Sequence, residues 1–142
     1  MFDRILVPVD IGDDPISAKC LYVAAELARQ FGAKLHVLTV VPDIGYAVVA
    51  QYFPPGAEAK IAEDAGEQLS DFVKQHLPSG MTAHEMVAQG PVYDEILSVA
   101  ETLKADLIVI GAHRPDLRDY LLGPNAARVV RHAGASVFVV RT

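Results

Sequence analysis

Short apolar segments alternate along this chain with segments whose apolar residues recur every three or four positions. The apolar runs predict β-strands at residues 4–9, 33–41, 106–110 and 136–141, and a more polar run predicts an edge strand at 82–87. Between them, one helix is expected to open at Asp13-Asp14-Pro15 and to end at Gly32, and others are expected at 57–77, 91–104 and 125–133. Strands that alternate with helices in this way predict right-handed β-α-β crossovers and therefore a parallel sheet.

The predicted fold is an α/β domain with an open, five-stranded parallel sheet and helices on both faces. The 142 residues, of which 51% are hydrophobic, suffice for one domain of ordinary size with a substantial core. No internal repeat, low-complexity tract or linker divides the sequence, so one domain is expected to span residues 1–142. The connection at 42–56 is apolar for a loop, and we expect it to fold over a cleft or to pack against a partner.

Composition argues against several classes of partner. A formal net charge of −6 repels phosphate backbones and anionic lipid, so binding to nucleic acid or to a membrane surface is not expected. The apolar runs are too short to span a bilayer, and Met1-Phe2-Asp3-Arg4 lacks the regions of a signal peptide. The single cysteine, Cys20, can form no internal disulfide and is expected to be a small core residue. These features predict a cytoplasmic protein with no metal centre of its own.

The carboxyl ends of the predicted strands are where chemistry is expected, because open parallel sheets bind ligands there, at the point where the strand order reverses. Gly111 ends the fourth strand and permits an unusual backbone angle or a close approach to a ligand. Further on, Gly123-Pro124-Asn125 opens the last helix, whose N-terminal amides and dipole favour an anion. These residues predict a phosphate cradle, and the alternative is that Gly123 only makes a turn while Asn125 only caps the helix.

Asp10 follows the first strand, and two roles are possible for its side chain. It can hydrogen-bond a ribose or help with a magnesium ion held by phosphates, or it can simply form the turn at Gly12. His113 and Arg114, just after the fourth strand, can contact phosphates, and the alternative for them is a solvated loop.

Several enzyme patterns are absent from the sequence. It contains no P-loop, no G-x-G-x-x-G after the first strand and no G-x-S-x-G elbow. No Ser/His/Asp set is proposed, because the serines, Ser17 among them, are expected to lie away from the strand ends that carry Asp10 and His113. His36 lies in the middle of a strand and is expected to be a satisfied core or edge residue rather than a ligand.

Three separated segments resemble the universal stress protein family. They are RILVPVD at 4–10, LHVLTVV at 35–41 and the tail IGAHRPDLRDYLLGPNAARVVRHAGASVFVVR at 110–141. The resemblance runs over essentially the whole chain and is closest to the branch of small stand-alone members that includes the universal stress proteins F and G. It implies an adenine nucleotide alpha hydrolase-like fold with strand order 3-2-1-4-5, in which the first and fourth strands flank the reversal.

The resemblance also implies a site for ATP, or for AMP or ADP, with magnesium as a possible companion. The matching positions would line the adenosine pocket, meet adenine through the backbone of one strand and enclose the phosphates: Pro8, Val9, Asp10, Val40, Gly111, Gly123, Pro124, Asn125 and Ala126. Two positions depart from the pattern. Arg114 stands where a second glycine is usual, and Pro124 replaces a serine or threonine and offers neither a hydroxyl nor an N–H.

Three functions remain open from the sequence. The first is a nucleotide-binding stress-response module without strong catalysis, the second a member that retains the fold but acts through protein contacts, and the third a slow ATP hydrolase. No strong general base is identifiable for the third. The family resemblance further implies a homodimer through the last strand, 136–141, as an antiparallel contact at the sheet edge.

Overall fold

The computed structural model describes residues 1–12, 14–41, 54–112 and 124–141. His113, Arg114 and Gly123 therefore lie outside the described residues, as does most of the apolar connection expected at 42–56. Of the helices in these ranges, none is long and apolar enough to cross a membrane.

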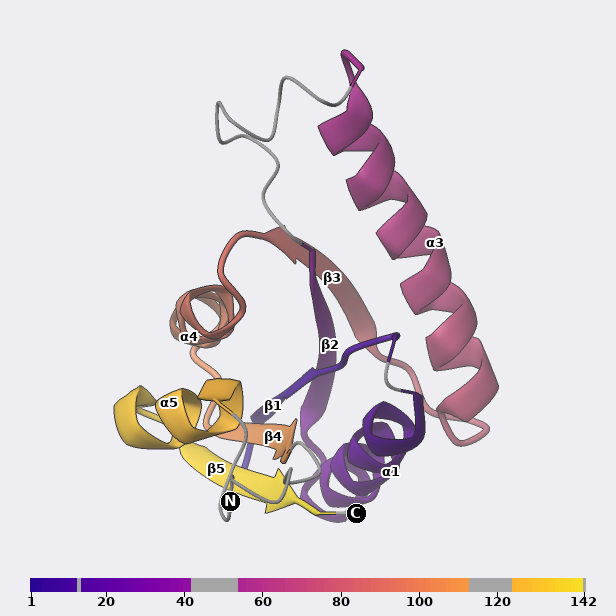
Figure 1. Ribbon diagram of the computed structural model, residues 1–142. Coiled ribbons are helices and arrows are strands. Elements are labelled where there is room, and N and C mark those ends of the chain that lie inside the picture. Colours follow the sequence, from indigo (N-terminus) through magenta and orange to yellow (C-terminus); the bar gives the residue numbers. More distant parts are fainter. Residues whose placement is uncertain (13, 42–53, 113–123, 142) are drawn as a thin grey trace.

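A five-stranded parallel sheet forms the centre of the molecule (Figure 1). Its strand order is β3-β2-β1-β4-β5, which confirms the predicted fold class and order. The strands are β1 (Arg4–Pro8), β2 (Lys34–Val41), β3 (His84–Gln89), β4 (Leu107–Gly111) and β5 (Ser136–Val140). The chain leaves β1 toward β2 on one side and returns to β4 on the other, so the order reverses between β1 and β4.

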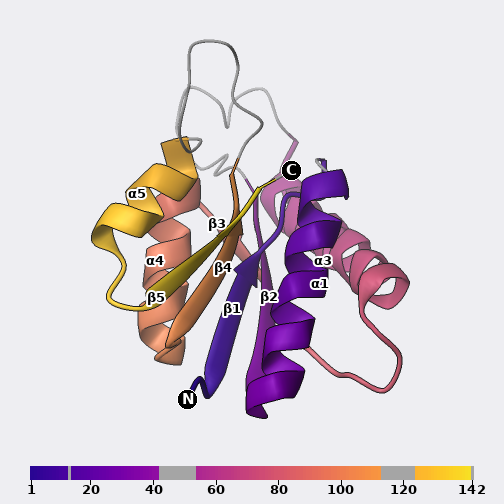
Figure 2. The ribbon, with the colours of Figure 1, turned by 90° about the horizontal axis from the view of Figure 1, so that it is seen from below.

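Helices cover both faces of the sheet (Figure 2). α1 (Asp14–Phe31) and α3 (Ala57–His76) lie on one face, and α4 (Val92–Leu103) and α5 (Pro124–His132) lie on the other. α5 corresponds to the helix expected at 125–133. It begins one residue earlier, at Pro124, because the fixed φ of proline suits the first helical position.

Side chains on successive residues of a strand point to opposite faces, and this alternation divides the core into two clusters. Ile5 and Val7 of β1 pack with α1 and α3, whereas Leu6 packs with α4 and α5. All three are fully buried. The sheet is thus apolar on both faces, as expected of a parallel sheet between two helical layers.

Candidate functional site

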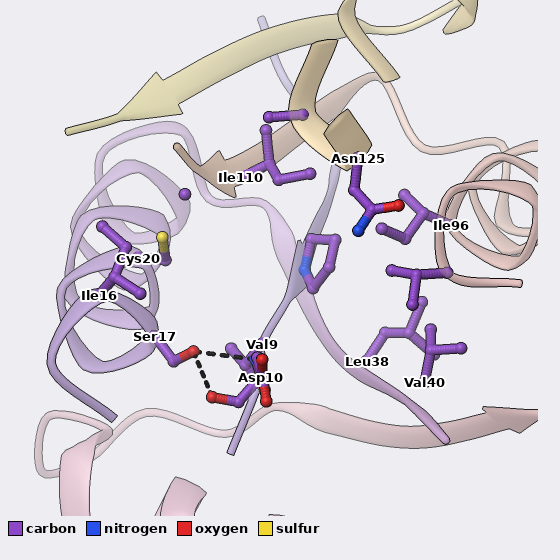
Figure 3. Close-up of a pocket in the computed structure, with 14 residues that line it drawn as sticks. Val9, Asp10, Ile16, Ser17, Cys20, Leu38, Val40, Ile96, Ile110 and Asn125 are labelled. Carbon is purple, nitrogen blue, oxygen red and sulfur yellow. Dashed lines mark hydrogen bonds between the residues drawn. The ribbon is translucent and has the colours of Figure 1, made fainter. Parts of the chain in front are cut away.

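A pocket of about 200 Å³ opens at the carboxyl ends of β1 and β4, where the strand order reverses (Figure 3). Most of the sequence-predicted site residues that the structure describes line it together: Pro8, Val9, Asp10, Val40, Gly111, Asn125 and Ala126. Pro124 begins α5 beside them. The structure therefore brings the residues predicted at separate strand ends into one pocket.

The two sides of the pocket differ in chemistry. On one side, α1 contributes Ile16, Ser17 and Cys20 near the end of β1. On the other side, the wall is apolar and consists of Leu38, Val40, Val92, Ile96 and Ile110 from β2, α4 and β4. An apolar wall opposite a few polar groups is the usual composition of a small-molecule site.

Ser17 holds the end of β1 against α1. Its hydroxyl accepts a hydrogen bond from the backbone N–H of Asp10 at 2.9 Å and donates one to the backbone carbonyl of Asp10 at 2.8 Å (Figure 3). Ser17 is buried, so this reciprocal pair satisfies backbone groups that have left the sheet. The expectation that Ser17 lies away from Asp10 was wrong, because the short loop after β1 turns the first helical turn of α1 back over the strand end.

The Asp10 carboxylate forms a local turn. Its Oδ1 accepts a hydrogen bond from the backbone N–H of Gly12 at 3.0 Å, which is the turn that was weighed as the alternative role for this residue. The side chain is nevertheless exposed at the pocket, and a carboxylate accepts several hydrogen bonds at once. Asp10 can therefore hold its own loop and still contact a ligand.

Gly111 has a packing role that the sequence did not reveal. A Cβ atom at this position would lie 2.6 Å from Cγ1 of Ile16 and 3.0 Å from Sγ of Cys20. The backbone of Gly111 does not adopt a left-handed conformation, so the requirement for glycine comes from the close approach of α1. α1 and β4 are therefore in contact at Gly111, at the same place where this residue lines the pocket.

α5 points its N-terminal end at the pocket, through Asn125 and Ala126. With proline at the first helical position, the N–H groups of these next two residues are among those that have no intrahelical acceptor. Together with the helix dipole, such groups favour an anion.

Seven pocket residues were not predicted as ligand contacts: Ile16, Ser17, Cys20, Leu38, Val92, Ile96 and Ile110. Five of them lie on the helices α1 and α4, whereas the predicted contacts were placed at strand ends, and Leu38 and Ile110 lie within β2 and β4. Cys20 was correctly expected to be a small buried residue, at 1% exposure, but it also forms part of the wall. The helical residues among them could have been predicted from the face that each helix turns toward a strand end. The first two turns of a helix that follows a parallel strand pack back over that end.

His36 lies away from the pocket and differs from expectation. It is buried, as predicted, but neither imidazole nitrogen has a hydrogen-bonding partner in the described part of the chain, so it is not a satisfied core residue. Its ring stacks on that of His84, its neighbour across β2 and β3, with centroids 4.9 Å apart. Burial, followed by the nearby charges of His84, Arg4 and Lys34, lowers the pKa of His36 below its ordinary value.

Comparison with known proteins agrees with this architecture. The model of the universal stress protein family matches residues 1–141. Universal stress protein G of Shigella flexneri is 33% identical over an alignment that covers 99% of this chain and 100% of that protein.

Solved structures are similar as well. Universal stress protein UspA from Lactobacillus plantarum superposes with a TM-score of 0.72 at 29% identity, covering 99% of this chain and 98% of that one. A universal stress protein crystallised in complex with cAMP has the same fold, with a TM-score of 0.75 at 21% identity, covering 98% of this chain and 97% of that one. The match over nearly the full length, together with the sheet order and the motifs at its strand ends, establishes that this chain belongs to the universal stress protein family.

Proposed function

We propose that this protein is an adenine-nucleotide-binding module of the stress response, with ATP, ADP or AMP as its ligand and without strong catalysis. The observation that carries the proposal is the pocket at the reversal of strand order, which combines an apolar wall, the Asp10 carboxylate and the N-terminal end of α5. Each of these suits one part of a nucleotide.

The base would lie against the apolar wall of Leu38, Val40 and Ile96, with the backbone of Val40 at its edge. Asp10 would accept a hydrogen bond from the ribose or help to hold a magnesium ion bound to the phosphates. The amides of Asn125 and Ala126 would face the phosphates. The family resemblance adds Gly111, His113, Arg114 and Gly123 to the phosphate side.

Two further considerations support an adenine nucleotide. One relative with the same fold is a complex with cAMP, which contains an adenine base, a ribose and a phosphate. The acidic net charge of −6 disfavours long polyanions such as nucleic acid, and it is compatible with a small anion held locally at a helix N-terminus.

Calorimetric titration with ATP tests the proposal. Replacing Asp10→Ala removes a charged acceptor, which typically contributes about 1.5–3 kcal/mol, so the affinity should fall roughly tenfold to a hundredfold. Asp71→Ala on the exposed surface of α3 is the matched control and should bind as the parent does. A parent protein that binds no ATP, ADP or AMP at millimolar concentration contradicts the proposal and favours a fold-only member that acts through protein contacts.

Pro124→Ser gives a second arm to the same titration. Serine restores a backbone N–H and adds a hydroxyl where proline has neither, so ATP should bind more tightly than to the parent.

An assay of phosphate release, with Asp10→Ala for comparison, measures the slow hydrolysis that would be the weaker alternative.

The proposal includes an assembly and a location. The chain would act in the cytoplasm as a homodimer, with β5 of one protomer beside β5 of its partner. β5 is the last strand of the described sheet, and its outer edge offers backbone groups for pairing.

A further inference from the structure

The chain leaves the sheet at Asp10, and Ser17 takes over the hydrogen bonding that the neighbouring strand no longer provides. The backbone N–H of Val9 still donates a hydrogen bond to the carbonyl of Leu38 in β2, at 2.8 Å. One residue later, the backbone N–H and carbonyl of Asp10 both pair with the Ser17 hydroxyl instead, at 2.9 Å and 2.8 Å (Figure 3). One side chain of α1 therefore holds the backbone from which the Asp10 carboxylate extends.

Ser17 is itself fixed by the packing of α1. It is 3% exposed, and Ile16 and Cys20 on the same helix lie so close to Gly111 of β4 that they leave no space for a side chain there. A hydroxyl on a helix packed this tightly is a rigid point of attachment for the loop that follows β1.

The Asp10 carboxylate is restrained at one oxygen and keeps the other. Its Oδ1 accepts the hydrogen bond from the backbone N–H of Gly12, and the hydrogen bonds found within the described ranges include none to Oδ2. The Ser17 hydroxyl restrains the backbone and the Gly12 N–H restrains the side chain, so the remaining oxygen is held in place before a ligand arrives. Ordering an acceptor in advance lowers the entropy cost of binding.

The Ser17 hydroxyl has a single proton and donates it to the carbonyl of Asp10, so it has none to donate to a ligand. We propose that Ser17 is a positioning residue of the nucleotide site, which acts by holding Asp10 where its carboxylate contacts the ligand. This inference rests on the proposed function and adds to it the residue on which the Asp10 contact depends.

A double-mutant cycle followed by calorimetric titration with ATP tests the inference. Ser17→Ala should lower the affinity roughly three- to tenfold in the parent, because the loss of both hydrogen bonds lets Asp10 leave its position. In an Asp10→Ala background the same substitution should change the affinity by less than about twofold, since no carboxylate remains to be positioned.

Ser17→Cys separates hydrogen bonding from packing. Cysteine is close to serine in shape, but its thiol is a weak donor and a weak acceptor. Under reducing conditions this variant should therefore lose nearly as much affinity as Ser17→Ala, and it replaces Ser17→Ala in the cycle if the alanine variant does not fold.

Leu21→Val is the matched control. Leu21 is fully buried, lies one turn further along α1 and does not line the pocket. The loss of one methylene should lower the urea midpoint while the affinity for ATP stays at the value of the parent.

Three results overturn the inference while the parent still binds ATP. The first is parental affinity in Ser17→Ala or in Ser17→Cys, and the second is an equal loss from Ser17→Ala with and without the Asp10 carboxylate. The third is parental affinity in Asp10→Ala, because there is then no contact to position. A parent that binds no adenine nucleotide contradicts the proposed function itself, and the inference falls with it, so the two failures are distinguishable.

Discussion

At the scale of single residues, Gly111 shows how tightly the site is built into the packing of the sheet. The end of β4 and the first turns of α1 approach so closely that the space for one methyl group is already filled by Ile16 and Cys20. A glycine in such a motif is easily attributed to a ligand, yet here the helix accounts for it without one.

Replacing Gly111→Ala should destabilise the protein by about 1–3 kcal/mol, because the added methyl group lies 2.6 Å from Cγ1 of Ile16 and forces a shift in a packed core. Urea unfolding measures the change. In an Ile16→Ala background, which removes the clashing atom, the same substitution should cost clearly less. Equal costs in both backgrounds would mean that Ile16 is not what excludes a side chain.

Gly66 provides the opposite case for comparison. It lies inside α3, and a Cβ atom there meets only Cγ2 of Val87, at an ordinary contact distance of 3.9 Å. Gly66→Ala should therefore stabilise the protein by roughly 0.5–1 kcal/mol through helix propensity.

At the scale of elements, the pairing of β2 with the edge strand β3 contains the stacked rings of His36 and His84. Protonating His36 would place a charge among buried groups and beside Arg4, Lys34 and His84, all of them basic. The neutral ring is thus the form compatible with this edge of the sheet.

Stability should fall as the pH drops below about 6.5, the ordinary pKa of histidine, because the unfolded chain then binds a proton that the lowered pKa of His36 denies to the folded chain. For one such group the slope is at most about 1.4 kcal/mol per pH unit, and it ends once the pH falls below the folded pKa. Urea unfolding between pH 7.5 and 5 measures it for the parent and for His36→Leu, which should lose less stability over this range. Thr39→Val, a buried and non-titrating change in the same strand, should retain the parent's slope. Equal slopes in parent and His36→Leu would contradict this account.

Most elements could be predicted from the sequence because their apolar periodicity is strong, and β3 illustrates the limit. The sequence pattern predicted this strand at 82–87, whereas β3 spans His84–Gln89 in the structure. The segment is polar and only partly buried, so its own pattern fixes neither end. Its position follows instead from pairing with β2, from His36 opposite His84 to Val41 opposite Gln89.

The same distinction applies to the pocket. Pro8, Asp10 and Gly111 were predictable because a parallel topology gathers strand ends at one edge of the sheet. Ser17 and Ile96 were not, because their contribution depends on how far each helix leans over that edge, which is decided by packing between elements distant in sequence.

At the scale of the whole molecule, the outer edge of β5 is the surface at which the proposed dimer would form. Phe138 remains 44% exposed there, while Val137 and Val139 are partly buried against the α4 and α5 layer. An apolar edge strand of this kind is a natural partner for its own copy.

Sedimentation at micromolar concentration should give the mass of two chains for the parent. Val139→Asp and Phe138→Asp should each shift the mass toward one chain, because a two-fold contact brings every introduced charge close to its own copy. Phe138 is already exposed in the protomer and tolerates the charge, so that variant guards against simple unfolding. Ala59→Asp on the exposed surface of α3 is the control and should leave the mass unchanged. A parent with the mass of one chain would refute the dimer.

The pocket also touches both halves of the core. Ile16 and Cys20 belong to the cluster beneath α1, and Ile96 and Ala126 belong to the cluster beneath α4 and α5, which the sheet otherwise keeps apart. A molecule bound at this edge would contact both layers of the core at once. Its binding would raise the free energy of unfolding by mass action, by about 2.7 kcal/mol when its concentration is a hundred times its dissociation constant. The lifetime of the folded protein in a cell would then depend on the concentration of that molecule, so the amount of this protein would change with the metabolic state of the cell.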